Sequence, residues 1–247
     1  MGPAQRRIIT ALACSLPLLA GCSSPAPAGP SPVVGAAAPV LSVGDHWELG
    51  VQITSRGTTS QANLTMTVNS TTEKWAIGAG TYEAVLLETR THQTSGPVGW
   101  RVIQRVWQRT ADGSQLHANV TTIDDKDGSQ QVSVTEYDGP CRQYPWPITV
   151  GATMSGECRT HDPAVDPPQI TTTKYTVTAL AMENITVPAG TFETYRLNFT
   201  IESGIASHVT QVRWYSPKVC NDVRTETRTG QGAFITELKS YSCATGA

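Results

Sequence analysis

One short sequence occurs twice in this chain. Val187–Tyr195 reads VPAGTFETY, and Ile77–Val85, 110 positions earlier, reads IGAGTYEAV. In the later copy, Pro188 presets φ for a type I turn, and Gly190 can take the left-handed conformation that closes a three-residue hairpin with a bulge. The earlier copy keeps the last glycine and has a permissive glycine in place of the proline. Each copy therefore predicts a tight hairpin that feeds a strand.

The similarity extends well beyond the turn. A Val-Gly pair precedes each copy, at residues 43–44 and 150–151, and an alternating run separates this pair from the turn. After the turn, each copy has a strand that ends in tryptophan, Trp107 or Trp214, and then two runs split by a turn that contains glycine. Apolar and polar residues alternate with the period of a strand that has one buried face. The pattern predicts a duplicated supersecondary unit of about six strands.

The fold class follows from this repeat and from the residue types between the turns. The sequence has no convincing helix after the N-terminal segment, and its abundant threonines favour a pleated surface. Short turns between strands favour antiparallel pairing. We therefore expect an all-β fold of two tandem antiparallel meander repeats, at residues 41–139 and 140–247. They form either paired small β domains or one large curved sheet, a barrel-like shell.

The N-terminus has the pattern of an export signal. Residues 1–21 contain two arginines, then an apolar run without acidic residues, which is too short to span a bilayer as a mature helix. The signal ends Leu-Leu-Ala-Gly before Cys22, which resembles the bacterial lipobox, where the cysteine receives lipid. We expect lipidation of Cys22 by acyl chains such as palmitate. The alternative is an ordinary signal with a bystander cysteine.

Residues 22–40, rich in Pro, Ala and Ser, cannot bury a core and predict a stalk. We expect the mature protein on the extracytoplasmic face of a bacterial cell membrane, held by the lipid anchor at Cys22. Loss of the signal's two arginines takes the formal net charge from −2 to −4. No basic patch emerges, which argues against nucleic acid as a partner.

Four cysteines remain in the mature chain after Cys22: Cys141, Cys158, Cys220 and Cys243. An even number in an exported protein favours disulfides, and four cysteines allow three pairings. A hairpin that turns at residues 230–232 places Cys220 opposite Cys243, so that Cys141 pairs with Cys158 across the junction of the repeats. Zinc is the alternative, but the cysteines lack close paired spacing and strong histidine partners. We expect no metal and no cofactor.

The second repeat carries a resemblance to a known family. The run V-P-A-G-T-F-E, a strand, the motif W-Y-x-P at Trp214, Tyr215 and Pro217, and a last hairpin resemble the TapB-like periplasmic domains of unknown function. The resemblance covers mainly residues 171–242, with a fainter echo in the first repeat. It departs from the family where residues 218–221 replace a Gly-rich turn. The resemblance implies an exported β-rich domain and brings no catalytic residue.

The chain contains no nucleophile-elbow, H-E-x-x-H or P-loop motif, and we expect no enzymatic activity. The acidic run Asp124–Ser129 is like part of a calcium loop, but it lacks the distal glutamate, and a hairpin tip is favoured. Residues 159–168 contain His161, Asp162 and Asp166, which could hold a metal or line a pocket, although a solvated loop is favoured.

The six tryptophans could form an aromatic binding surface, but core packing is the favoured interpretation. They are Trp47, Trp75, Trp100, Trp107, Trp146 and Trp214. For the whole protein we expect non-catalytic binding of a lipid or other apolar ligand by a membrane-anchored envelope lipoprotein. The alternative is a displayed interaction module that contacts another envelope protein or the cell wall. A hydrolase that uses His161 or Asp162 is the least favoured hypothesis.

Overall fold

Strands make up every regular element in the described part of the chain. A computed structural model describes residues 35–95, 99–163, 170–203, 207–230 and 232–244. Cys22, the signal and most of the expected stalk lie outside these residues, as does Asp166. Within them, no helix is long and apolar enough to cross a bilayer.

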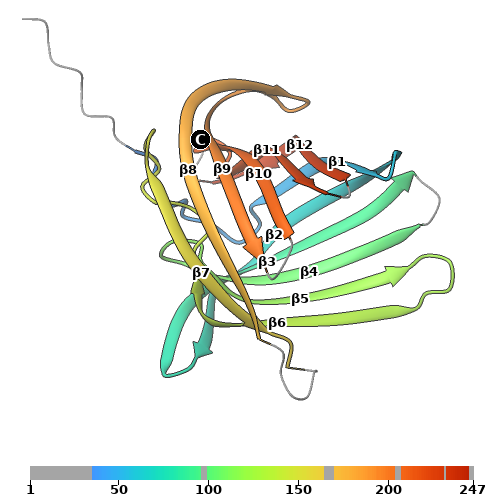
Figure 1. Ribbon diagram of the computed structural model, residues 1–247, viewed down its shortest axis with the longest axis horizontal. Helices are drawn as coiled ribbons and strands as arrows, with labels where there is room; N and C mark the ends of the chain where they lie inside the picture. Colours follow the sequence, from blue (N-terminus) through green and yellow to red (C-terminus); the bar gives the residue numbers. More distant parts are fainter. Residues whose placement is uncertain (1–34, 96–98, 164–169, 204–206, 231, 245–247) are drawn as a thin grey trace, which may run out of the picture. The chain divides into compact units, whose positions relative to one another are not determined.

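Twelve antiparallel strands close into one barrel (Figure 1). Each strand pairs with the next along the chain, and β12 pairs with β1 over ten residue pairs, from His46↔Ser242 to Ser55↔Gly232. The expected all-β fold is thus confirmed, in its form of one barrel-like shell. The strands are β1 (His46–Ser55), β2 (Thr58–Ile77), β3 (Gly80–Ser95), β4 (Trp100–Arg109), β5 (Gln115–Asp124), β6 (Gln130–Cys141), β7 (Thr153–His161), β8 (Thr171–Val187), β9 (Gly190–Ser203), β10 (Ser207–Ser216), β11 (Asn221–Thr229) and β12 (Gly232–Ser242).

The two copies of the repeated turn occupy equivalent places in this barrel. One joins β2 to β3 and the other joins β8 to β9, and these four strands are the longest in the fold. The backbones of the two turns differ. Gly190 has a φ of 129°, a conformation that glycine adopts without strain, whereas in the first copy Gly78 has the positive φ, of 56°. A positive φ at the first turn position is the pattern of a type II′ hairpin.

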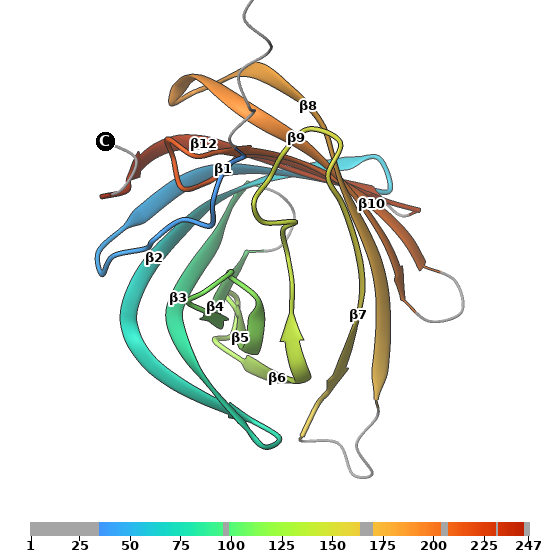
Figure 2. The same cartoon turned by 90° about the vertical axis from the view of Figure 1, so that its left-hand side faces the viewer.

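Each long hairpin bends where its first strand carries bulges, between Val68 and Glu73 in β2 and between Ala179 and Ala181 in β8. Bulges bend a strand and increase its twist. Beyond the bends, the two arms, residues 70–86 and 181–195, fold back over the outside of the barrel. Figures 1 and 2 show the β8–β9 arm curling over β10–β12. Its tip is fixed by a hydrogen bond, 3.0 Å long, from the Ala189 N–H to the Leu238 carbonyl.

The first arm makes an equivalent contact on the outer face of β4 and β5. Trp75 from the arm stacks on His117 with the ring centroids 4.3 Å apart, and Trp107 lies 5.0 Å from both rings. Trp214, at the corresponding place in the second repeat, donates its indole N–H to Glu183 of the second arm over 2.7 Å. The repeated turn is therefore the tip of an arm that packs against the outside of later strands of its own repeat.

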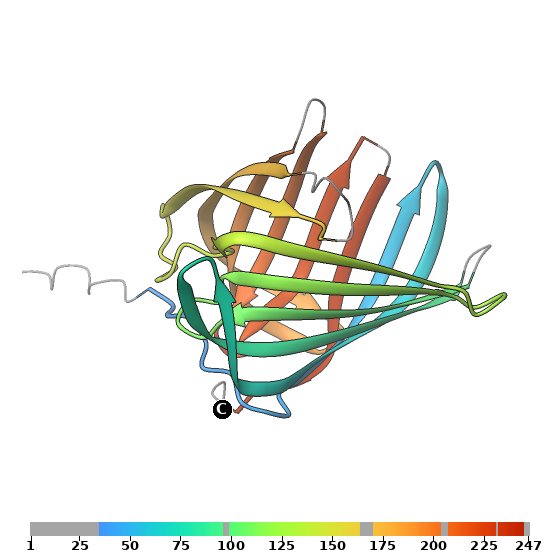
Figure 3. The same ribbon diagram turned by 90° about the horizontal axis from the view of Figure 1, so that it is seen from below.

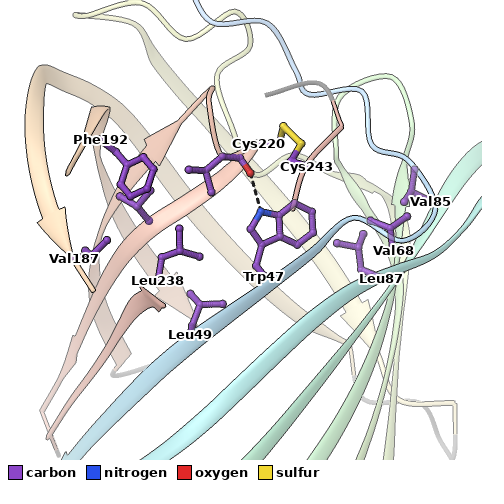
Figure 4. Close-up of a cluster of buried hydrophobic side chains, with 12 residues drawn as sticks. Trp47, Leu49, Val68, Val85, Leu87, Val187, Phe192, Cys220, Leu238 and Cys243 are labelled. Carbon is purple, nitrogen blue, oxygen red and sulfur yellow. Dashed lines mark hydrogen bonds between the residues drawn. A yellow bond between two sulfur atoms is a disulfide. The ribbon is translucent and has the colours of Figure 1, made fainter. Parts of the chain in front are cut away.

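Two buried clusters hold one end of the barrel together. The larger centres on Trp47, whose indole N–H donates to the Val219 carbonyl over 2.7 Å (Figure 4). Its other members include Leu49, Val68, Val85, Leu87, Val223 and Leu238, with Val187 and Phe192 from the second arm. The second cluster consists of Ile148, Val177, Ala179, Tyr195, Leu197, Phe199 and Tyr215. Burial of a large apolar side chain contributes about 1.5–3 kcal/mol, so these clusters stabilise this end most strongly.

The two walls of the barrel cross one another, with β3–β6 running across the direction of β9–β12 (Figure 3). One junction between the walls is thin. β6 and β7 pair only at Glu136↔His161 and Tyr137↔Thr160, and we call this junction the seam. A disulfide between Cys141 and Cys158 crosses the seam beside these pairs.

Cys220 is bonded to Cys243, so both disulfides are the pairings expected from the hairpin geometry. Six strands fall in each predicted repeat, although β6 continues to Cys141, past the expected boundary at residue 139. The junction of the repeats, residues 142–152, contains no strand and three of its residues enter the barrel end, as described below.

Candidate functional site

Two irregular segments cover the end of the barrel where the buried clusters lie. The strap, residues 36–45, leads into β1, and the linker, residues 142–152, joins β6 to β7. They pair with each other through two backbone hydrogen bonds between Ala36 and Ile148, 2.8 and 2.9 Å long. We call this end, together with the turns at residues 110–114 and 217–220, the base. Two prolines in the linker, Pro145 and Pro147, lack the N–H that a strand would need.

The linker places two aromatic rings inside the base. Tyr144 and Trp146 contact each other and both contact Tyr215, with ring centroids 5.0–5.7 Å apart. The Trp146 indole N–H donates to the Asp112 carbonyl over 3.0 Å, which fixes the linker to the turn between β4 and β5. These contacts hold the linker as a plug in the base.

A cavity of about 210 Å³ lies between the plug, the strap and the inner face of the barrel. Its apolar wall includes Pro39 and Leu41 of the strap and side chains of β1–β3. Its polar wall is made by a few amide and charged side chains from β4, β5, the linker, β10 and β11. The apolar members are Pro39, Leu41, Trp47, Met66, Val85, Leu87, Trp146 and Cys220, and the polar members include Gln108, Gln115, Gln143, Arg213, Asn221 and Asp222.

Asp222 is the most buried charged residue in this wall, with 7% of its surface exposed. Its Oδ2 accepts a hydrogen bond, 2.9 Å long, from the Tyr144 hydroxyl and lies 4.0 Å from Nε of Arg213. Its Oδ1 has no hydrogen-bond partner among the described residues. A buried acceptor without a partner costs about 1–3 kcal/mol, so the arrangement is not optimised for stability alone.

The negative charge of Asp222 is balanced by the positive charge of Arg213 beside it. Burial raises the pKa of Asp222, while the positive charge of Arg213 and the hydrogen bond from Tyr144 act in the opposite direction. Burial, followed by the charge of Asp222, raises the pKa of the Tyr144 hydroxyl. Arg213 also lies over the Phe199 ring, 4.1 Å from its centroid, and donates to Gln211 over 2.6 Å. Arg213 is thus held by several contacts inside the barrel.

A second cavity, of about 270 Å³, lies on the inner side of the seam. Gln115, Gln143 and Arg213 line both cavities, so polar side chains separate two spaces inside the same barrel. Tyr175 and the Cys141–Cys158 disulfide line the second one. Tyr175 lies across Gly156, where a Cβ atom would come within 2.3 Å of its hydroxyl oxygen. A glycine at this position therefore leaves room for the tyrosine against the wall.

The polar residues that the sequence offered as metal or pocket candidates, His161, Asp162 and the run Asp124–Ser129, line neither of these two cavities. His161 is at the seam, 3.2 Å from a carboxylate oxygen of Glu136 and 3.6 Å from one of Asp138, and Asp162 follows it beyond the end of β7. Residues 125–129 form the turn between β5 and β6, where Asp124, at the end of β5, and Asp127 each accept a backbone N–H group over 2.8 Å, as in a hairpin tip. No group of three or more His, Cys, Asp or Glu side chains in the described residues could hold a metal ion.

The six tryptophans do not form one surface. Trp47 is in the core and Trp146 lies in the plug. Trp75 belongs to the first arm and packs on Trp107, Trp214 bonds to the second arm, and Trp100 begins β4. Sequence reasoning missed Tyr144, Arg213 and Asp222. Only Arg213 could have been found from the sequence. It is a charged residue at an inward position in the alternation of β10, between Gln211 and Tyr215.

Comparison with known proteins gives the fold little further context. No protein-family model and no curated protein matches the chain, so the resemblance to TapB-like domains stays a prediction. Two crystal structures are similar over 85% of this chain and all of theirs, each with a TM-score of 0.44. One is a candidate exported protein of YmcC-like fold from Bacteroides fragilis, at 12% identity, and the other a candidate lipoprotein from Parabacteroides distasonis, at 14%. Fold and site define a closed β-barrel with two interior cavities.

Proposed function

We propose that the mature chain is a lipid-anchored envelope protein that binds an apolar or amphipathic ligand inside its barrel, without catalysing a reaction on it. The observation that carries the proposal is the cavity at the base, which combines an apolar wall with a few inward polar groups. This combination is usual for small-molecule sites, where apolar surface supplies affinity and polar groups fix orientation.

The size of the interior supports a ligand of this kind. A dry cavity of about 150 Å³ accommodates benzene, and the base cavity, at about 210 Å³, is larger. The neighbouring cavity of about 270 Å³ shares three polar side chains with it. An amphipathic molecule would place its apolar part against Leu41, Met66 and Leu87 and its polar part near those shared side chains.

The anchor and the location rest on the sequence. The lipobox-like end of the signal supports lipidation at Cys22, and two disulfides suit a protein that matures in an oxidising compartment. The intact mass of the protein, purified from membranes of a bacterial host, tests the anchor directly. A mass without acyl groups would overturn it.

Ligand binding is tested by native mass spectrometry of residues 23–247, produced with a cleavable export signal and then extracted with organic solvent. We expect a co-purifying lipid or other apolar compound at one copy per chain. Met66→Trp fills the base cavity and should lower this occupancy by about tenfold or more, corresponding to at least about 1.4 kcal/mol. Met182→Trp, on an exposed side chain of the second arm, is the matched control. A clean apo mass for the parent chain would sink the proposal.

One observation favours the alternative of a displayed interaction module. β7 does not pair with the part of β6 between Gln130 and Thr135 in the described chain, and Val132 in this part is 59% exposed. Unpaired strand edges accept strands from other proteins. Capture of an envelope protein that is lost on Val132→Lys, while Met182→Lys retains it, would support this second function.

A further inference from the structure

The base is also the end of the barrel from which the chain leads back to its expected lipid anchor. We propose that the base rests on the membrane surface, so that the cavity exchanges its ligand directly with the bilayer. This inference rests on the proposed function, which supplies the anchor and the apolar ligand. The occupant of the surface is a lipid bilayer.

Exposed apolar side chains gather at the base. Val40 and Val43 of the strap are 70% and 64% exposed, and Val150 of the linker is 49% exposed. Leu180 is 45% exposed and follows Ala179, whose carbonyl accepts a hydrogen bond from the linker at Gly151. These are four of the seven large exposed apolar side chains in the described residues, the others being Val132, Ile170 and Met182. Single exposed valines are common, but a gathering at one end indicates a contact surface.

The charges at the base do not oppose contact with a membrane. Asp45 accepts hydrogen bonds from the backbone N–H groups of Ser42 and Ala244, and Asp112 forms an ion pair with Arg109. Asp222 is buried, as described above. Lys218 is exposed at the turn between β10 and β11, where a positive charge would favour an anionic lipid surface.

The length of the tether, the segment between Cys22 and Ala36, favours membrane contact through the base over contact through the far end of the barrel. Fourteen residue steps separate Cys22 from Ala36, which gives a maximum reach of about 50 Å. β1 alone has ten residues and spans about 33 Å from the base toward the far end. Contact through the far end would therefore require most of the tether to run along the barrel wall. Contact through the base requires no part of the tether to run along the wall.

The strap connects the surface to the cavity. Val40 lies between Pro39 and Leu41, both of which line the cavity, while its own side chain faces outward. The same segment thus forms part of the cavity wall and part of the exposed apolar end. A bilayer in contact with the strap would lie on the other side of this wall, which gives an apolar ligand a short path that avoids water.

Membrane contact through the base is tested with a polarity-sensitive fluorophore attached either at the base or at the far end of the barrel. Single variants Val43→Cys, at the base, and Val132→Cys, near the β5–β6 tip, are made in the full chain, whose other mature cysteines are lipidated or disulfide-bonded. The labelled proteins, with acylation checked by intact mass, are reconstituted in vesicles of phosphatidylcholine and phosphatidylglycerol. We expect a blue shift and quenching by nitroxide-labelled headgroups for the probe at position 43 only. Equal responses at both positions, or a response at 132 alone, would overturn the inference.

The ligand measurement keeps this inference separate from the proposed function. A bound lipid with no membrane contact at position 43 would remove the orientation alone, whereas contact without any bound lipid would remove ligand binding. As a second check, Val40→Asp with Val43→Asp should slow transfer of a fluorescent fatty acid from vesicles to the protein by about tenfold, since each buried charge opposes membrane contact. The same double variant should bind that fatty acid from detergent-free solution as the parent does. Unchanged transfer from vesicles would contradict the inference.

Discussion

At the scale of single residues, the Tyr144–Asp222 hydrogen bond is the most consequential contact in the base. The two residues are 78 positions apart, and the bond joins the plug to β11. Tyr144→Phe removes a donor from a buried carboxyl whose other oxygen has no partner in the described residues. We expect a loss of about 1.5–3 kcal/mol in the free energy of unfolding, measured with urea. Tyr137→Phe removes a hydrogen bond to the neutral amide of Gln115 and should cost about 0.5–1.5 kcal/mol. Equal costs would show that the charge of Asp222 adds nothing.

His117 gives the first arm a dependence on pH. Burial lowers the pKa of His117, an effect that the charge of Glu136 partly offsets. Because the folded state then favours the neutral ring, this contribution to stability is complete above the unfolded pKa of about 6.5 and is lost as the pH falls through and below it. As the pH falls, we expect the thermal midpoint to decrease less for His117→Phe than for the parent protein. This variant keeps a ring against Trp75 and Trp107. His92→Phe, on an exposed histidine, is the control. Parallel pH profiles for parent and His117→Phe would contradict this account.

At the scale of elements, the arms depend on the conformation of their tips. Gly190 has a φ of 129°, which residues with a Cβ rarely adopt, so Gly190→Ala should cost more than about 1 kcal/mol. The loss should be local, with faster amide hydrogen exchange in residues 181–195 and little change in β4–β6. Gly230→Ala is the control, because no atom lies within 4 Å of its added Cβ and its φ is not in the left-handed region. Equal exchange in the two variants would show that the tip does not hold the arm.

The seam should be the weakest junction of the barrel. Only two residue pairs join β6 to β7, so the disulfide between Cys141 and Cys158 carries much of the connection. A crosslink that closes a loop of about 15 residues contributes about 3 kcal/mol. Replacing both cysteines by serine should therefore speed hydrogen exchange in β6 and β7 far more than in β1 and β12, which share ten pairs. If exchange rose evenly around the barrel, the seam would be as strong as the other junctions.

At the scale of the whole molecule, the sequence could predict what is local and repeated. Alternation along each strand and the two copies of the turn indicate twelve strands in two meanders, and the turn at residues 230–232 indicates one disulfide. Closure of the barrel depends on the pairing of β1 with β12, nearly 200 positions apart, which no local pattern encodes. The cavity depends on the linker, whose prolines indicate a loop but not that Tyr144 enters the base. Contacts between distant segments therefore explain why the candidate site was missed.

One repeat of the barrel should not fold on its own. A fragment of residues 35–141 contains one complete meander, but it has two unpaired edges, β1 and β6, and it lacks the plug that packs against Tyr215. Exposed edges and a missing core favour association over folding. We expect this fragment to give no cooperative thermal transition by circular dichroism. A chain cut in the turn between β11 and β12 keeps every strand, with Cys220 bonded to Cys243, and should unfold cooperatively. Cooperative unfolding of the fragment would contradict this prediction. It would mean that a single repeat folds as an independent domain and that the barrel forms when two folded domains associate.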